Sequence, residues 1–149
     1  MIKINIKNDI ANATEFIKEV FLAFPDIANT VINIGGTTSF KEQLNEGGLP
    51  ITDKLEDDID CLCMGFDTEL TFKKLEDACI LLGRNIDYIA TNPDWVCPTW
   101  YGFVPDCGSV SEMLYNATKR RPKFIGKPQP EMALLAMEKT GFSVQILVI

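Results

Sequence analysis

Short runs of apolar and β-branched residues alternate along the chain with stretches whose apolar positions recur every three or four residues. The short runs predict strands and the recurring positions predict helices. The strands are expected at residues 2–6, 30–34, 59–64, 87–91, 123–126 and 144–149. The helices are expected at residues 10–23, 39–45, 71–82, 109–119 and 129–140. This alternation predicts an α/β fold with a largely parallel sheet and right-handed crossovers.

Small polar residues and glycines mark the ends of several predicted helices. Ser39 and Thr71 are expected to be N-caps, and Ser109 or Ser111 is expected to begin the fourth helix. Gly83 follows the last apolar position of its helix and is expected to end it.

The segment 92–108 is the one long connection that the pattern leaves irregular, and connections of that length in compact domains are usually functional. It begins with "ATNPDWVCP", which places Asn92 and Asp94 just after a strand, where parallel α/β folds bind ligands. Asn-Pro-Asp is also ordinary turn chemistry, so both interpretations stay open. The aromatic residues Trp95, Trp100 and Tyr101 could pack on a ligand ring or belong to a core.

Three other places carry candidate chemistry. Asp67 follows the strand at 59–64 and could contact a ligand or accept hydrogen bonds within its own turn. The helix start after "VPDCG" could hold an anion or be an ordinary capped terminus. Lys127 stands between a glycine and a proline in "IGKPQPEM", where a lysine suits a phosphate or a paired carboxylate, although most lysines are solvated surface residues.

Composition limits the chemistry that these positions can support. The 149 residues are 46% hydrophobic, which is enough for one domain with a sizeable core. The chain has no histidine, so Ser-His and Cys-His nucleophilic pairs are excluded and catalysis must use carboxylates, lysine, cysteine or a metal. A net charge of −7 argues against nucleic acid or an anionic membrane as partner.

The five cysteines are an odd number, and the opening residues MIKINIKND lack the apolar core of a signal peptide. The thiols are therefore expected to be reduced and the protein cytoplasmic. Cys61 and Cys63 are expected to be buried small side chains rather than zinc ligands, because no second cysteine pair stands at a suitable spacing.

Taken in order, the motifs "VINIGG…SFKEQL", "MGFDTELTFKKLEDACILL", "DYIATNPDWVCPTWYGFVPDCGSVSEML…AT" and "FIGKPQPEMALLAM" resemble the NagD-like and p-nitrophenylphosphatase branch of the haloacid dehalogenase superfamily. The resemblance runs from about residue 9 to residue 149. It implies a magnesium-dependent phosphohydrolase that acts on phosphorylated small molecules through an aspartyl-phosphate. It also implies a Rossmann-like core and a C2-type cap that selects the substrate.

The resemblance assigns roles to particular positions. Lys127 matches the motif-three lysine that supports the nucleophile and the phosphoryl oxygens. Asp67 and the turn Asn92-Pro93-Asp94 match cap segments that face the active site. The substrate-specificity loop is matched by Val96, Cys97, Pro98 and their neighbour Trp95. Cys97 stands where some relatives carry a histidine, so their specificity does not transfer.

Several family motifs are absent from these 149 residues: Asp-x-Asp-Gly-Thr, Thr-Asn-Asn and the Gly-Asp motif that helps to hold Mg²⁺. The expected division is a partial core at 1–34, a C2-type cap at 35–122 and a partial core at 123–149. The chain is expected to lack phosphatase activity by itself. Strands at 30–34, 123–126 and 144–149 are expected to expose edges that favour homo-oligomers. The alternative is a non-catalytic α/β module that binds a small ligand or a protein.

Overall fold

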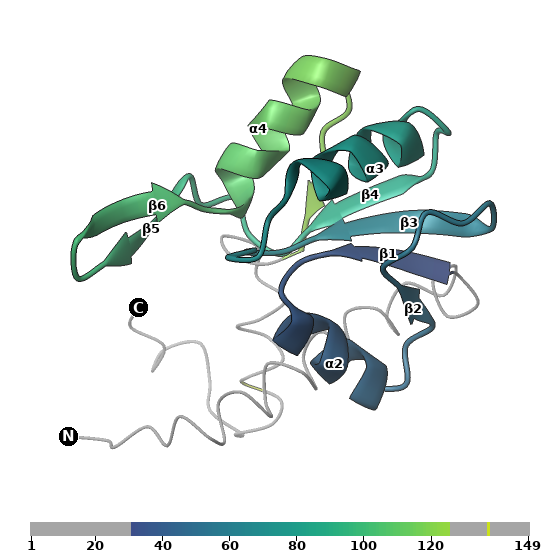
Figure 1. Cartoon of the computed structure of the whole chain (residues 1–149), viewed down its shortest axis with the longest axis horizontal. Helices are drawn as coiled ribbons and strands as arrows, with labels where there is room; N and C mark the ends of the chain where they lie inside the picture. Colours follow the sequence, from purple (N-terminus) through teal and green to yellow (C-terminus); the bar gives the residue numbers. More distant parts are fainter. Residues whose placement is uncertain (1–30, 126–136, 138–149) are drawn as a thin grey trace.

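A five-stranded parallel sheet forms the centre of the molecule in a computed structural model that describes residues 31–125 and residue 137 (Figure 1). The sheet has the strand order β2-β1-β3-β4-β7. Its strands are β1 (Val31–Gly35), β2 (Ile51–Thr52), β3 (Ile59–Met64), β4 (Asp87–Ala90) and β7 (Lys123–Phe124). The helices are α2 (Thr38–Glu46), α3 (Phe72–Leu82) and α4 (Cys107–Thr118). The α/β class and the parallel pairing predicted from the sequence are therefore confirmed.

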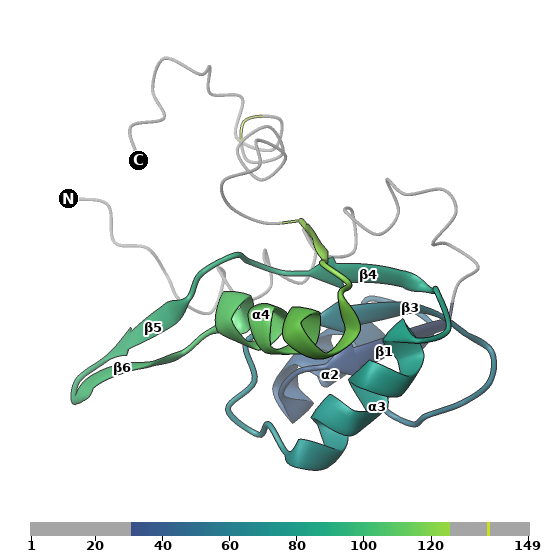
Figure 2. The ribbon, with the colours of Figure 1, turned by 90° about the horizontal axis from the view of Figure 1, so that it is seen from above.

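Helices cover both faces of this sheet, which explains why its central strand is apolar at consecutive positions. Helices α3 and α4 lie on one face and α2 lies on the other (Figures 1 and 2). Leu62 and Met64 of β3 pack in the cluster that contains α3 and α4, whereas Cys61 and Cys63 pack in the cluster that contains Leu44 of α2.

The helix starts agree with the sequence prediction at one of three positions. Thr71 caps α3 as expected, and its side chain accepts a hydrogen bond from the backbone N–H of Lys74. Thr37, not Ser39, caps α2, because Thr37 is extended and its hydroxyl accepts from the N–H of Phe40. Asp106 caps α4, so the predictions of Ser109 and Ser111 were wrong.

The segment 92–108 is not irregular throughout, as the sequence pattern had indicated. It contains an antiparallel hairpin of β5 (Val96–Thr99) and β6 (Gly102–Pro105), which projects beyond the sheet (Figure 1). The sequence analysis missed these strands because the prolines at 98 and 105 argue against strand structure. Proline is nevertheless tolerated in edge strands, and both strands of this hairpin are edge strands. The two-residue strand β2 was missed as well.

Strands β1 and β7 hydrogen-bond into the same sheet as β3 and β4, so the sheet continues across the boundaries predicted at 34/35 and 122/123. The division into cap and core stays a prediction. The prediction that strand 30–34 exposes an edge was wrong, because β1 pairs with β2 on one side and with β3 on the other. The elements predicted at 2–6, 10–23, 129–140 and 144–149 lie outside the described residues, apart from residue 137, which is helical.

Candidate functional site

The carboxyl ends of β1, β3 and β4 meet at one edge of the sheet, because the three strands run parallel. The turns that follow them span residues 36–37, 65–71 and 91–95. Open parallel sheets bind their ligands outside this edge. The structure therefore brings the segments of two predicted sites, Asp67 and Asn92–Asp94, to the same edge.

The Asp67 carboxylate is already paired within the fold. Its side chain is 1% exposed and lies 2.7 Å from the ammonium of Lys74. It also accepts a hydrogen bond of 2.8 Å from the N–H of Glu69, which closes its own turn. The ammonium of Lys74 donates in addition to the carbonyl oxygen of Gly36 at 3.2 Å, so this ion pair ties the turn after β3 to the turn after β1.

A second carboxylate, Glu69, occupies the start of α2. It accepts from the N–H of Thr38 at 3.2 and 3.1 Å and from the Thr38 hydroxyl at 2.7 Å. These hydrogen bonds hold the pKa of the Glu69 carboxyl below its ordinary value. The partial positive charge at this helix start is thus met by a side chain of the protein.

Asn92 closes the turn that follows β4. Its side-chain oxygen accepts from the N–H of Asp94 at 3.0 Å, and its amide nitrogen donates to the carboxylate of Asp106 at 3.4 Å. The same carboxylate accepts from the N–H of Cys107 at 2.6 Å. The start of α4, which the sequence left open as an anion site, is therefore capped by its own aspartate.

Helix α4 holds this turn in place through backbone contacts. The N–H of Gly108 donates to the carbonyl of Asp94 at 2.8 Å, and the N–H of Asp106 donates to the carbonyl of Trp95 at 3.1 Å. A Cβ atom on Gly108 would lie 2.2 Å from the carbonyl oxygen of Pro93. Only glycine allows this approach. The motif "DCGS" alone does not reveal that a glycine is required at this position.

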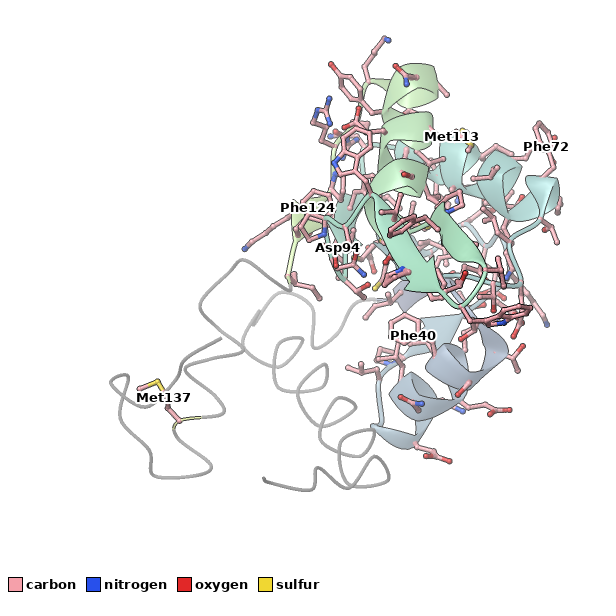
Figure 3. The ribbon with its side chains drawn as sticks, turned by 90° about the vertical axis from the view of Figure 1, so that its left-hand side faces the viewer. Phe40, Phe72, Asp94, Met113, Phe124 and Met137 are labelled. Atoms are coloured by element: carbon pink, nitrogen blue, oxygen red, sulfur yellow. The ribbon has the colours of Figure 1, made fainter. Side chains whose placement is uncertain are left out.

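The carboxylate of Asp94 and the hairpin beyond it are exposed and available for contact with a ligand. The Asp94 carboxylate is exposed and forms no hydrogen bond or ion pair with any described residue; Figure 3 marks its position beside the hairpin. Val96 and Pro98 are exposed and Cys97 is half-buried. Lys127 lies outside the described residues.

A cleft of about 370 Å³ lies between α2 and β2, away from the turn that follows β4 (Figure 1). The ion pair of Lys41 with Asp53, at 3.1 Å, forms part of its lining. None of the site residues predicted from the sequence lines this cleft, so it adds nothing to the chemistry of the turn.

The part of the chain that the structure describes contains no metal centre, and three of its thiols are buried and poorly reactive. No group of three or more carboxylates or cysteines there is arranged to hold a metal ion. Burial raises the pKa of the Cys61 thiol to about 12 and raises the pKa values of Cys63 and Cys107 as well, so these thiols are poor nucleophiles. None of the described helices is long and apolar enough to cross a membrane.

Comparison with known proteins shows which proteins this chain is similar to. No family model matches the chain. It is 32% identical to an acid sugar phosphatase of Staphylococcus haemolyticus over 109 residues, which is 73% of this chain and 40% of that protein. It is 34% identical to an acid sugar phosphatase of Staphylococcus epidermidis, over 74% of this chain and 44% of that protein.

Solved structures that share the fold of this chain are phosphatases as well. A 4-nitrophenylphosphatase from Thermotoga maritima matches 87% of this chain and 48% of its own, with a TM-score of 0.77 and 34% identity. A glycerol phosphate phosphatase from Mycobacterium tuberculosis, crystallised in complex with magnesium, matches 87% of this chain and 40% of its own, with a TM-score of 0.77 and 25% identity. The chain thus spans less than half the length of these relatives. Over most of its length the chain is similar to part of these phosphatases, which agrees with the resemblance of its motifs to the NagD-like and p-nitrophenylphosphatase branch of the haloacid dehalogenase superfamily.

Proposed function

We propose that the chain supplies the substrate-selecting segment of a phosphohydrolase that acts on phosphorylated small molecules. The observation that carries this proposal is the match to a 4-nitrophenylphosphatase over 87% of the chain at 34% identity. In this proposal the turn after β4 and the hairpin beyond it would offer side chains to a ligand, and α4 would hold the turn through its backbone hydrogen bonds. Such a segment would choose the substrate, and catalytic groups elsewhere would transform it.

The residues of the turn and the hairpin have different parts in this proposal. Asp94, Val96 and Pro98 have exposed side chains and would contact the substrate, with the half-buried Cys97 beside them. Asn92 and Pro93 would position those side chains, since the Asn92 amide already bonds within the turn. Asp67 would bind a substrate only if its ion pair with Lys74 broke. We therefore propose that Asp67 acts mainly by stabilising the turn after β3.

Lys127 is the proposed catalytic residue of the chain, on the strength of its motif alone. A lysine there would neutralise charge that develops on a phosphoryl group. We propose Mg²⁺ as the cofactor of the whole enzyme, in keeping with the magnesium complex of the Mycobacterium tuberculosis phosphatase. The described residues do not form a site that fits this ion, so its ligands would lie elsewhere in the protein.

The test begins with the coding DNA on both sides of these 149 residues and with the length of the native polypeptide. We expect flanking Asp-x-Asp and Gly-Asp motifs, and phosphate release by the native polypeptide from sugar phosphates or glycerol phosphate with millimolar Mg²⁺. Lys127→Ala is expected to lower kcat by about 10²- to 10³-fold. Lys54→Ala, at an exposed lysine between β2 and β3, is the matched control and should leave kcat unchanged.

A native polypeptide without these motifs and without phosphate release would contradict the proposal. The second candidate, a non-catalytic module that binds a small ligand or a protein, would then be favoured. One observation already points toward it: the carboxylates of Asp67, Glu69 and Asp106 are bonded within the fold at the edge where ligands usually bind.

We propose a cytoplasmic location, because all five cysteines are free thiols although several of them are buried near one another in the core. Association of the chain into a homo-oligomer also belongs to the proposal.

A further inference from the structure

The connection from β2 to β3 leaves part of the sheet without a covering helix. Residues 53–58 join the two strands and contain no helix, although parallel strands are usually joined through one. Ile32 of β1 packs on the α2 side, so its neighbour Asn33 points to the face that carries α3. There the amide nitrogen of Asn33 donates to the carbonyl oxygen of Lys54 at 2.9 Å, so the connection crosses over β1.

A partly enclosed cavity of about 80 Å³ lies between this connection and α3. Strands β1 and β3 form its floor, and α3 forms one wall. Its volume is about half that of a cavity, roughly 150 Å³, that accepts benzene. Lys41 and Asp53 line both this cavity and the cleft of about 370 Å³ between α2 and β2, so the two hollows adjoin. The head group of a small molecule can therefore enter the cavity while the rest of the molecule lies in the cleft.

The charged side chains that line the cavity balance one another. They are two lysines and two aspartates, Lys41, Lys74, Asp53 and Asp77, so their net charge is zero in a chain of net charge −7. The side chains of Lys41, Asp77 and Lys74 are only 18%, 19% and 25% exposed. Charged groups withdrawn from water need charged or strongly polar partners. A ligand that complements this lining therefore carries both signs of charge.

The two ammonium groups have donors to spare. A lysine ammonium can donate three hydrogen bonds. The ammonium of Lys74 uses two of them, to the carboxylate of Asp67 and the carbonyl oxygen of Gly36. The ammonium of Lys41 uses one, to the carboxylate of Asp53. Both lysines can therefore bind a carboxylate in the cavity without breaking the ion pairs that they already form.

Acceptors are available in the same cavity. Asn33 is 7% exposed, and its side-chain oxygen accepts no hydrogen bond from any described residue, although its nitrogen is bonded to Lys54. The Asp77 carboxylate is bonded to Lys73 alone among the described residues, which leaves most of its acceptor capacity unused. An unpaired oxygen on a nearly buried side chain is costly. The N–H groups of an ammonium would satisfy it.

We propose that this cavity binds the head group of a small zwitterion, an α-amino acid. The carboxylate of the ligand lies between the ammonium groups of Lys41 and Lys74, and its ammonium donates to Asn33 and Asp77. This head group has about five heavy atoms, which suits a cavity about half the size of one that accepts benzene. The side chain of the ligand extends into the adjoining cleft, whose lining is mainly polar. Inorganic phosphate is disfavoured because Asp53 and Asp77 repel it, and a polyol leaves the four charges uncompensated.

Titration of the 149-residue chain with glycine, L-serine and L-glutamine tests this proposal, with glycerol and inorganic phosphate as competing probes. Calorimetry gives the Kd, and ¹H–¹⁵N correlation spectra locate the ligand. We expect at least one of the amino acids to bind with a Kd of about 1 mM or tighter. The side-chain amide signal of Asn33 and the backbone signal of Gly35 should shift, and the signals of the hairpin at 96–105 should not. Asp77→Asn is expected to raise the Kd by about tenfold or more.

Glu76→Gln is the matched control, because Glu76 also lies on α3 and pairs with the same Lys73, at 3.4 Å, but does not line the cavity. It should leave the Kd within about twofold of the wild type. Lys41→Gln removes a charge from the opposite wall and should raise the Kd as Asp77→Asn does, so the proposal does not depend on the folding of one variant.

Four results would each overturn the proposal. They are no saturable binding of any of the three amino acids up to about 20 mM, equally tight binding of glycerol or phosphate, shifts confined to signals away from the cavity, and equal effects of Asp77→Asn and Glu76→Gln. Glycerol or phosphate as the tighter ligand would instead identify a polyol or an anion site. Phosphatase activity enters none of these measurements, so this proposal and the proposed function stand or fall separately.

Discussion

Replacing Gly108 by alanine would place a methyl carbon where the carbonyl groups of the preceding turn already lie. The added Cβ would be 2.2 Å from the oxygen of Pro93 and 2.7 Å from the oxygen of Asp94. Both contacts are to backbone, which cannot swing aside as a side chain can. Helix α4 and the turn at 92–95 must therefore separate, and the hydrogen bond from the N–H of Gly108 to the carbonyl of Asp94, now 2.8 Å, is lost or lengthened.

The expected cost follows from three contributions. The lost backbone hydrogen bond contributes about 1 kcal/mol, and the forced separation of packed groups contributes about 1–3 kcal/mol. The higher helix propensity of alanine returns up to about 1 kcal/mol. The free energy of unfolding should fall by about 1–3 kcal/mol, which lowers Tm by about 3–9 °C in a chain of this size.

Thermal and urea denaturation followed by far-UV circular dichroism would measure this change, with tryptophan emission as a local probe beside the turn. Gly83→Ala is the control, because Gly83 has an ordinary helical φ of −69° and its nearest Cβ contact would be 3.3 Å. We expect that control to change the free energy of unfolding by less than about 1 kcal/mol. An equal Tm for Gly108→Ala, Gly83→Ala and the wild type would refute the idea that close approach of α4 fixes the turn.

Two further predictions concern titratable groups. A hydrogen bond from Lys41 holds the pKa of the Asp53 carboxyl below its ordinary value, and hydrogen bonds from Thr38 do the same for the Glu69 carboxyl. The stability that these hydrogen bonds contribute is present above about pH 4. It is lost as the pH falls through the lowered pKa values of the folded state. Asp53→Asn with Glu69→Gln should flatten the slope of unfolding free energy against pH between about pH 4 and pH 2, and an unchanged slope would contradict this. Iodoacetamide at pH 8 should label Cys97 in the native protein and spare Cys61, Cys63 and Cys107, whose pKa values burial raises; peptide mass spectrometry that found Cys63 labelled as fast as Cys97 would contradict the packing of that strand.

The amino-acid pattern predicted the sheet well because its strands are apolar on both faces and its helices carry strong periodicity. The strand at 59–64 and the helix ending at Gly83 appear where the sequence places them. Local chemistry was less predictable, since a cap depends on backbone angles that several neighbouring threonines, serines and aspartates could adopt. Thr37 and Asp106 were missed as caps for that reason.

The sequence predicted that the Asn-Pro-Asp turn lies at the carboxyl edge of the sheet but did not predict the hydrogen bonds within it, and the role of the turn as a binding site stays a prediction. A strand followed by Asn-Pro-Asp indicates the ligand-binding edge of a parallel sheet, and the turn lies at that edge. The partners of Asp67 and Asn92 come from Lys74 and Asp106, which are 7 and 14 residues away in the sequence and meet them only in the folded chain.

We propose that this segment selects a substrate but does not itself carry out the chemistry. The most direct test is hydrolysis of p-nitrophenyl phosphate by the 149-residue chain in millimolar Mg²⁺, measured beside Lys127→Ala at the same concentration. We predict that the two proteins release p-nitrophenol at the same background rate, because Asp-x-Asp-Gly-Thr is absent from the sequence. Turnover by the wild-type chain that Lys127→Ala abolishes would contradict the account.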